Sequence, residues 1–342
     1  MNIKETLRGT KGGKIQSCGI MQVIPIILEE ESLEEKDLIS PNQARFSTTG
    51  YGQMRFVNKS DKTLLVPCHT GYIVKEEAQN HAMSESGLVG PDEEEEFDNA
   101  RCIQQSQGGY ISEDQHEMMI LPMSLRESAL KKRKRKGCSE LWEDISSFNA
   151  KLGLDRRGHL EIFFNKFEKE LDEFVTQFEI VRNQIGAIIL INGEVVGIER
   201  APSREYWKDI WQALIRECYG SLAIEVEKTK RAINPDKYRV KLGKSKGKTL
   251  KDILVQVKKS EESEKKKAKK IIASILSLDL NEEEDGSKGS YSTFTVTNKN
   301  FTGQILKEGE EGAVVYASLF AKEGWEREAK RKIWEEASEF TL

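Results

Sequence analysis

The chain has 342 residues, 37% hydrophobic and 32% charged, so it carries enough apolar side chains for a buried core, and disorder of the whole chain is excluded. Its 53 basic and 57 acidic residues leave a net charge of only −4, which excludes a uniformly basic nucleic-acid-binding surface. The longest apolar run, Ala187 to Ile191, is far shorter than the roughly 20 residues of a membrane-spanning helix. We therefore expect no membrane association and no nucleic-acid partner.

The cysteines and the N-terminal segment indicate a reducing compartment. Five cysteines occur, an odd number, and none lies in a C-x-x-C pair, which argues against a disulfide framework and a zinc site. The four histidines are scattered and suggest no metal site either. The first residues are basic but lack the apolar segment of a secretory signal. We expect a cytoplasmic protein without a bound metal, and the sequence assigns no cofactor.

Strand patterns dominate the first 75 residues. Met21 to Leu28 is apolar and rich in β-branched side chains, and Gln53 to Asn58 and Thr63 to Pro67 carry the same signal on either side of a turn. Two charged runs follow, an acidic one from Asp92 to Glu96 and a basic one from Lys131 to Lys136. Charge runs without interleaved aromatic residues are typical of solvated loops, so we predict loops at both places.

Polar side chains crowd the segment from Asn99 to Tyr110, which contains Arg101, Cys102, Gln104 and Gln105. Amide side chains form paired hydrogen bonds with ribose hydroxyls, amides and base edges, so this segment is a candidate ligand site. Cys102 is also a candidate nucleophile, because a neighbouring arginine favours the thiolate. The alternative is a polar surface loop, and the sequence assigns no histidine partner to the thiol.

Helical periodicity begins near Leu160. Large apolar side chains recur there at spacings of three and four, which predicts one long helical face packed in the core rather than a cofactor site. The side chains of this face are Phe163, Phe167, Leu171, Phe174, Phe178 and Val181.

A β-hairpin and a helix are predicted next. Ala187 to Ile191 and Glu194 to Ile198 are apolar runs joined by an Asn-Gly dipeptide, which favours a type I′ turn. Ser203 is well placed to cap the N-terminus of a following helix. We expect this helix to end at Gly220 and to be followed by a strand from Ser221 to Glu227.

The segment between the hairpin and this helix is a candidate anion site. A helix N-terminus offers unpaired N–H groups and the positive end of the helix dipole. Arg200 and Arg204 add charge-assisted donors for a phosphate or carboxylate. Glu199 is the carboxylate placed by well-defined local structure, so we select it as the candidate general base. The alternative is a Glu–Arg pair that only stabilises the start of the helix.

The sequence becomes lysine-rich after about Arg231, and we place a domain boundary there. Gly243 to Thr249 resembles a phosphate-binding loop, but only three residues separate its glycines where the motif needs four, so we favour a basic flexible loop. The other elements predicted here are helices at Leu250–Lys259, Ala268–Leu278 and Gly324–Glu339, an acidic loop at Asn281–Ser290, and strands at Tyr291–Thr297 and Ala313–Phe320.

Several short motifs occur together: Thr70-Gly71-Tyr72, Ala78-Gln79-Asn80, Ala100-Arg101-Cys102, Leu125-Arg126, and the hairpin and helix with Gly193, Gly197 and Trp207. Over roughly residues 20 to 225, they resemble the ARG and rhodanese-phosphatase-superfamily-associated protein domain (ARPP) of the first type. This family shares bacterial and phage genome neighbourhoods with ADP-ribosylglycohydrolase-like and phosphatase-like proteins. The resemblance therefore implies a role around NAD-derived or ADP-ribose-type ligands.

The resemblance does not supply a mechanism. Members of the family often carry a basic residue after the Gln-Asn pair and an acidic residue shortly after the cysteine. In this chain those places hold His81 and Gln104, so the resemblance implies no catalytic acid beside Cys102.

These observations combine into one set of expectations. We expect an α+β protein with a mixed or antiparallel sheet packed by long helices, divided into a domain of residues 1–230 with a polar pocket and a charged C-terminal lobe of residues 231–342. The expected function is binding or processing of a phosphorylated ribose or nucleotide of NAD-derived or ADP-ribose type. The expected setting is bacterial or phage conflict, or NAD metabolism. The ligand-binding residues are expected to be Gln79, Asn80, Arg101, Cys102, Gln104, Gln105 and Arg200, with Glu199 as the catalytic residue. The alternative is a non-enzymatic protein whose charged C-terminal lobe docks a protein partner.

Overall fold

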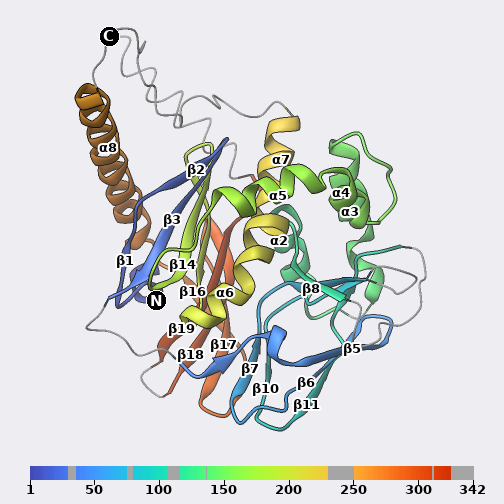
Figure 1. Cartoon of the computed structure of the whole chain (residues 1–342). Helices are drawn as coiled ribbons and strands as arrows, with labels where there is room; N and C mark the ends of the chain where they lie inside the picture. The colour runs from blue at the N-terminus through green and yellow to red at the C-terminus, as the bar shows by residue number, and fades with distance from the viewer. Residues whose placement is uncertain are drawn as a thin grey trace.

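A computed structural model describes residues 1–29, 36–74, 80–105, 116–135, 137–229, 250–309 and 312–324 of the chain (Figure 1). It has an α+β fold, as expected, with one large sheet, three small sheets and a set of helices. With a single exception among the described pairs, neighbouring strands run antiparallel.

The large sheet consists of nine strands: β1 (Thr10–Gly12), β2 (Gln16–Cys18), β3 (Met21–Leu28), β14 (Gln184–Ile191), β15 (Glu194–Arg200), β16 (Asn281–Lys288), β17 (Tyr291–Thr297), β18 (Phe301–Glu308) and β19 (Ala313–Ala321). Eight of them follow the order β1-β3-β14-β15-β19-β18-β17-β16, and β2 pairs with β3. The central strands β3 and β14 are covered on both faces, with every residue of β14 buried, which explains why their sequences are apolar throughout rather than alternating.

Several predicted strands of this sheet are confirmed. Met21–Leu28 forms β3, and the predicted strands near Tyr291 and Ala313 form β17 and β19. The predicted hairpin is the pair β14 and β15, and its turn residues Asn192 and Gly193 have φ values of 55° and 86°. This left-handed backbone is what a type I′ turn requires, so the Asn-Gly dipeptide fixes the hairpin register.

Three small sheets enclose a second hydrophobic core built around Phe46, Phe56 and Tyr72. Their strands are β4 (Leu38–Ile39), β7 (Thr63–Val66) and β10 (Gly87–Val89); β5 (Arg45–Gly50), β6 (Gln53–Val57) and β11 (Glu94–Phe97); and β8 (Thr70–Val74), β9 (His81–Ala82), β12 (Arg101–Cys102) and β13 (His116–Ile120). The acidic run predicted to be a loop thus forms most of β11. Its glutamates are tolerated because β11 is an edge strand, and Lys288 of β16 pairs with Glu95 at 3.0 Å.

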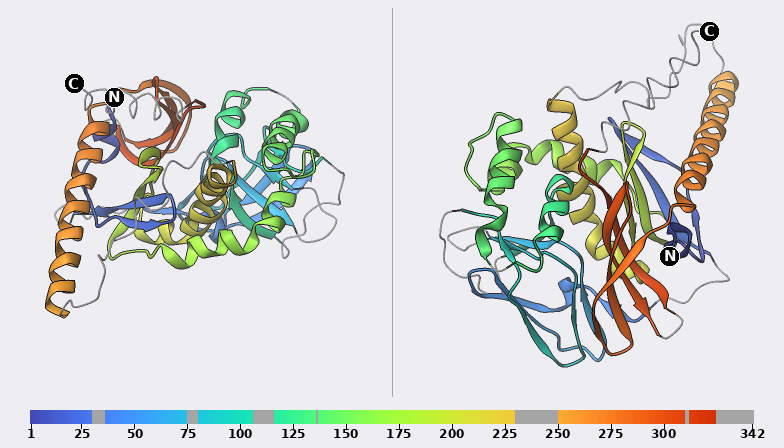
Figure 2. Two further views of the ribbon diagram at one scale, coloured as in Figure 1. Left: turned by 90° about the horizontal axis from the view of Figure 1, so that it is seen from above. Right: turned by 180° about the vertical axis from the view of Figure 1, so that it is seen from behind.

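The helices, with their bounds, are α1 (Ile3–Thr6), α2 (Met123–Lys131), α3 (Trp142–Lys151), α4 (Glu161–Lys166), α5 (Glu168–Gln177), α6 (Arg204–Ala213), the π-helix η4 (Leu214–Gly220), α7 (Ser221–Lys228) and α8 (Leu250–Leu276), with short 3₁₀ turns η2 (Pro41–Gln43) and η3 (Cys138–Leu141). The predicted apolar face is buried from Phe163 to Phe178 but is divided between α4 and α5. Packing by long helices is not confirmed, because α2 to α5 each have ten residues or fewer. Figure 2 shows α8 at the β1 edge of the large sheet, and its Ala268 and Ile275 are buried. No helix among the described residues is long and apolar enough to cross a membrane.

The helix capped by Ser203 was predicted to end at Gly220. In the structure it continues through η4 into α7. The cap is confirmed, since Ser203 Oγ accepts a hydrogen bond from Tyr206 N at 3.1 Å. Gly220 has helical backbone angles, and a Cβ there would lie 2.9 Å from Phe174 Cδ2, so this glycine allows α5 to pack closely rather than ending the helix. The predicted strand at Ser221 to Glu227 is helix α7. Its first six residues are all buried, and a helix buried all round has the uninterrupted apolar sequence of a buried strand.

The C-terminal half also differs from expectation in two places. The two helices predicted between residues 250 and 278 are the single helix α8, and the acidic loop predicted at Asn281–Ser290 is the edge strand β16. The carboxylates of β16 face the basic run that follows α2: Arg133 lies 3.1 Å from Asp285, and Lys134 lies 2.6 Å from Glu283. Charge complementarity therefore places this edge strand beside the basic run.

The large sheet is continuous across the domain boundary expected near residue 231. β15 pairs with β14 on one side and with β19 on the other, so the strands of the two halves meet side by side in one hydrogen-bonded sheet. A charged C-terminal lobe is not confirmed by this arrangement. Residues 230–249, with the phosphate-loop-like segment, and 325–342, with nearly all of the closing helix, lie outside the described residues. The division into two folding units stays a prediction.

Candidate functional site

A cluster of buried polar side chains surrounds the guanidinium group of Arg126 on α2. Arg126 Nη1 donates a hydrogen bond to Glu199 Oε1 at 2.9 Å, Nε donates to His69 Nδ1 at 3.0 Å, and Nη2 donates to Ser318 Oγ at 2.5 Å. Tyr219 OH donates to the same Glu199 oxygen at 2.6 Å. All five residues are buried, and Arg126 is 0% exposed. The cluster therefore joins α2, β15, η4, β19 and the start of β8 inside the protein.

Unusual backbone features hold this cluster in place. His69 has φ 66°, in the left-handed region that residues other than glycine seldom adopt. Tyr219 comes from the π-helix η4, and such widened turns occur frequently at functional sites. Gly197 on β15 leaves the space that the Tyr219 side chain fills, because a Cβ there would lie 2.0 Å from the hydroxyl oxygen. The space left by Gly197 thus lets the Tyr219 hydroxyl reach Glu199.

The cluster contains a buried ion pair between Arg126 and Glu199. Burial, and then the Arg126 charge, lower the pKa of His69 well below its ordinary value, so its ring is neutral and its Nδ1 accepts the hydrogen bond from Arg126. Burial raises the pKa of Cys218 to about 12 despite the nearby guanidinium, so this thiol stays protonated. None of these residues lines the surface cavity described next. Glu199 thus neutralises Arg126, and its role as a catalytic residue stays a prediction.

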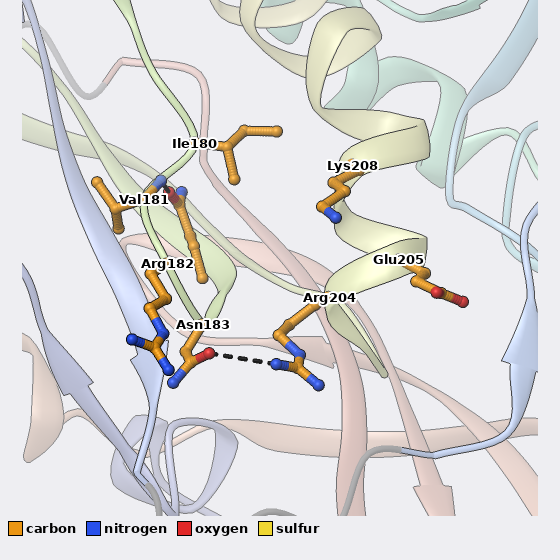
Figure 3. A pocket seen from close by; sticks show the side chains of 8 residues that line it. Ile180, Val181, Arg182, Asn183, Arg204, Glu205 and Lys208 are labelled. Atoms are coloured by element: carbon orange, nitrogen blue, oxygen red, sulfur yellow. Dashed lines mark hydrogen bonds between the residues drawn. The ribbon is translucent and has the colours of Figure 1, made fainter.

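A surface cavity of about 510 Å³ lies between residues 180–184 and the first turns of α6 (Figure 3). Three exposed cationic side chains line it: Arg182 from the preceding segment, and Arg204 and Lys208 from the helix. Glu205 is the one carboxylate among its lining residues. The volume falls within the range of about 300 to 1,000 Å³ that is usual for small-molecule sites.

The walls of this cationic pocket are fixed by local hydrogen bonds. Asn183 has φ 61°, and its Oδ1 accepts a hydrogen bond from Arg204 Nη1 at 3.2 Å. Gln184 closes the turn before it, because its Oε1 accepts from Val181 N at 2.9 Å and its Nε2 donates to Gly186 O at 2.9 Å. Residues 181–184 are therefore held as a preformed turn opposite α6.

The charges of the cationic pocket oppose the rules that stabilise helices. Arg204 and Lys208 lie in the first turns of α6, where the positive end of the helix dipole disfavours cations. They are also four residues apart on one helix face, where like charges repel, and Arg182 approaches from across the cavity. Departures from local stability rules are expected at functional sites. Among the described residues, no three His, Cys, Asp or Glu side chains are grouped to hold a metal ion.

Two of the predicted ligand-binding residues, Asn80 and Gln104, lie together. Asn80 N donates to Gln104 Oε1 at 3.3 Å, and the two side-chain amides donate to Glu161 at 3.1 and 3.5 Å. Gln105 Oε1 accepts a hydrogen bond from Gly158 N at 3.0 Å. The amides of Asn80 and Gln104 thus connect the region of β9 and β12 to Glu161, the first residue of α4. Glu161 was not identified as a site residue from the sequence. Gln79 lies outside the described residues.

Arg101 is buried and binds backbone carbonyl groups. Its Nη1 donates to Gly137 O at 2.9 Å, and its Nη2 donates to Lys132 O at 2.5 Å and to Arg135 O at 2.9 Å. The guanidinium thereby holds the basic segment that follows α2. Cys102 is buried beside it, and burial, followed by the neighbouring Cys138 thiol, raises the pKa of Cys102 far above its ordinary value. Cys102 therefore remains a thiol.

Glu199 and Arg200 point to opposite faces of β15, as neighbours on a strand do. Glu199 faces Arg126, whereas Arg200 Nη1 donates to the carbonyl oxygens of Thr6 at 2.8 Å and Arg8 at 2.9 Å. Burial lowers the pKa of Arg200 to about 10. The hydrogen bonds of Arg101, Glu199 and Arg200 thus reach three different parts of the structure. Their convergence on one ligand stays a prediction.

The fold and its sites define an α+β protein built on one continuous sheet, with an internal ion pair and a cationic pocket beside a helix start. The chain belongs to the family of the ARG and rhodanese-phosphatase-superfamily-associated protein domain, whose family model matches residues 9–320. The short motifs suggested a resemblance over roughly residues 20 to 225, and the family model extends it to include β16 to β19. No curated protein and no solved structure gives a significant match to the chain.

Proposed function

We propose that the protein binds a small phosphorylated ligand of the ribose or nucleotide type in the cationic pocket. The observation that carries the proposal is the presence of three exposed cations, Arg182, Arg204 and Lys208, around one cavity of about 510 Å³. A phosphate group accepts paired hydrogen bonds from a guanidinium and is attracted by an ammonium group. A bound anion would offset the mutual repulsion of the three side chains and would also be attracted by the N-terminus of α6.

Features beside the cations favour an organic phosphate over an inorganic one. Ile180, 36% exposed, gives the cavity an apolar wall, and Asn183 contributes an amide group that can meet sugar hydroxyls. An inorganic anion would use neither of these groups. The family membership supports the same direction, since the resemblance implies ligands of NAD-derived or ADP-ribose type.

Isothermal titration calorimetry with ADP-ribose, NAD, ribose 5-phosphate and inorganic phosphate tests this proposal. We expect at least one organic phosphate to bind more tightly than inorganic phosphate. We expect Arg204→Ala and Lys208→Ala each to weaken that binding by about tenfold or more, because a hydrogen bond to a charged group contributes about 1.5 to 3 kcal/mol. Lys299→Ala is the matched control, because Lys299 is an exposed cation in the turn between β17 and β18 and should leave the affinity unchanged.

Two results decide between the alternatives. Equal affinity in the Arg204 and Lys208 variants would place the ligand elsewhere and overturn the assignment to the cationic pocket. Binding of none of the four compounds would favour the alternative of an interaction protein whose charged segment after residue 231 docks a protein partner. Chromatography of the same mixtures separates binding from processing, since only processing yields a new compound.

A further inference from the structure

Cys102 and Cys138 lie side by side although a long segment of chain separates them. Cys102 is the last residue of β12, Cys138 is the first residue of η3, and these two elements pack together. The Cys138 thiol is close enough to Cys102 to contribute, after burial, to its raised pKa. The residues before them are also joined, because Arg101 Nη1 donates to Gly137 O at 2.9 Å. The Arg101 guanidinium therefore holds the backbone of the Cys138 segment against β12.

His81 and Gly52 complete the surroundings of this thiol pair. His81 lies opposite Cys102 in the β9–β12 pairing, and His81 Nε2 is 3.4 Å from Cys102 Sγ. The same nitrogen accepts a hydrogen bond from Gly52 N at 3.0 Å, so it is the unprotonated nitrogen of the ring. Gly52 has φ 74°, and a Cβ there would lie 3.1 Å from Cys138 Cβ, so glycine at this position suits both the backbone conformation and the close approach of Cys138.

The two thiols differ in their accessibility to solvent. Cys138 is partly exposed and can meet a reagent from solvent, whereas Cys102 is fully buried. We propose that Cys102 and Cys138 form a redox-active dithiol that reduces a peroxide and closes as a disulfide. This site is separate from the cationic pocket, and its chemistry does not depend on the ligand proposed there.

The reaction balances in two steps. The Cys138 thiolate attacks the peroxide, so that an S–O bond forms, the O–O bond breaks, and an alcohol, or water from hydrogen peroxide, leaves with the thiol proton. The Cys102 sulfur then attacks the sulfenic acid on Cys138, so that the S–S bond forms and the S–O bond breaks. The departing hydroxide leaves as water with the Cys102 proton, which passes through His81 Nε2. Two thiols and one peroxide thus give one disulfide, one alcohol and one water.

Peptide mapping of the full chain after treatment with one equivalent of hydrogen peroxide tests this proposal. We expect the Cys102 and Cys138 peptides to be joined with the loss of two hydrogen atoms, and dithiothreitol to restore both thiols. In Cys138→Ser the other cysteines should stay reduced. In Cys102→Ser the sulfenic acid should persist on Cys138 and be trapped by dimedone.

Cys18→Ser is the matched control, because Cys18 is also partly exposed but burial and the carboxylates of Glu173 and Glu227 raise its pKa. This variant should form the Cys102–Cys138 disulfide at the rate of the unaltered chain. Thermal melting of each variant verifies that it is folded. A disulfide that joins any other pair, or a Cys138 sulfenic acid that persists in the unaltered chain without forming a disulfide, would overturn the proposal.

Discussion

Arg126 has its charge and its hydrogen bonds satisfied without contact with solvent. Its guanidinium carbon lies 4.4 Å from the centre of the Phe320 ring, and its nitrogens bind Glu199, His69 and Ser318. Removing such a group from water is costly, and a carboxylate at hydrogen-bonding distance offsets that cost only while both partners are present. We therefore interpret Glu199 as the counter-ion of Arg126.

Replacement of Glu199 by glutamine should destabilise the fold. Because the Arg126 charge would remain buried without its counter-ion, we expect Glu199→Gln to lower the free energy of unfolding by about 3 kcal/mol. Urea denaturation followed by circular dichroism measures this change. The double variant Arg126→Met with Glu199→Gln should lose less than the sum of the two single losses, because it removes both charges.

The control for this prediction lies on the same helix. Lys131 pairs with Glu127 at 2.7 Å, but its side chain is 68% exposed, so Lys131→Met should leave the free energy of unfolding nearly unchanged. An unaltered stability in Glu199→Gln would show that the carboxylate is not needed by the fold, and would support its sequence-based interpretation as a general base.

The π-helix η4 is the element that links the buried cluster to the packing of α5. It places Cys218 and Tyr219 next to Arg126, and Gly220 at its end lets α5 approach closely. Glu217, the residue before Cys218 in η4, is also buried, and it accepts a hydrogen bond from Arg216. Burial raises the pKa of Glu217 to about 7, and the Arg216 charge only partly opposes this effect.

Glu217 should make stability depend on pH near neutrality. Its folded-state pKa of about 7 lies above the unfolded value of about 4.3, so between these two values the folded state binds the proton and the unfolded state does not. The free energy of unfolding should therefore fall as pH rises from 5 to 7, by at most about 1.4 kcal/mol per pH unit, and this contribution should be constant above pH 8.

Urea denaturation at pH 5, 6, 7 and 8 checks the titration of Glu217. The Glu217→Gln variant cannot titrate, so the decline between pH 5 and 7 should be smaller in this variant than in the unaltered chain. The same pH profile in both chains would assign the decline to other groups.

The molecule as a whole depends on its C-terminal strands. β19 lies between β15 and β18, and its Ser318 and Phe320 complete the surroundings of Arg126. Without it, one edge of β15 and the Arg126 cluster would be open. Sheet continuity thus makes residues on both sides of the expected boundary parts of one buried core.

A fragment of residues 1–229 tests whether the chain folds as two units. Because its unpaired β15 edge and incomplete Arg126 cluster would face water, we expect the fragment to lack a cooperative unfolding transition and near-ultraviolet circular dichroism. The full chain provides the reference under the same conditions. A fragment that unfolds cooperatively would support the division near residue 231 that the sequence suggested.

The candidate site was only partly predictable from the sequence. Arg204 was identified as a donor at a helix start, because the N-cap signal of Ser203 is local. Arg182 was not, because its place opposite α6 depends on how the turn before β14 packs in three dimensions. The partners of Arg101 were also unpredictable, since they are backbone carbonyl groups, which every residue possesses.

The sequence by itself determined the α+β class, the β14–β15 hairpin, the capped start of α6 and the buried strand β3, because turn chemistry, capping and apolar runs act between residues close in the chain. Tertiary structure alone decided that α7 is a helix and that the acidic segments β11 and β16 are edge strands. It also decided that Glu199 lies within hydrogen-bonding distance of Arg126. These outcomes depend on which distant segments become neighbours, and the free energy of burial and pairing there exceeds the weak local preferences of the chain.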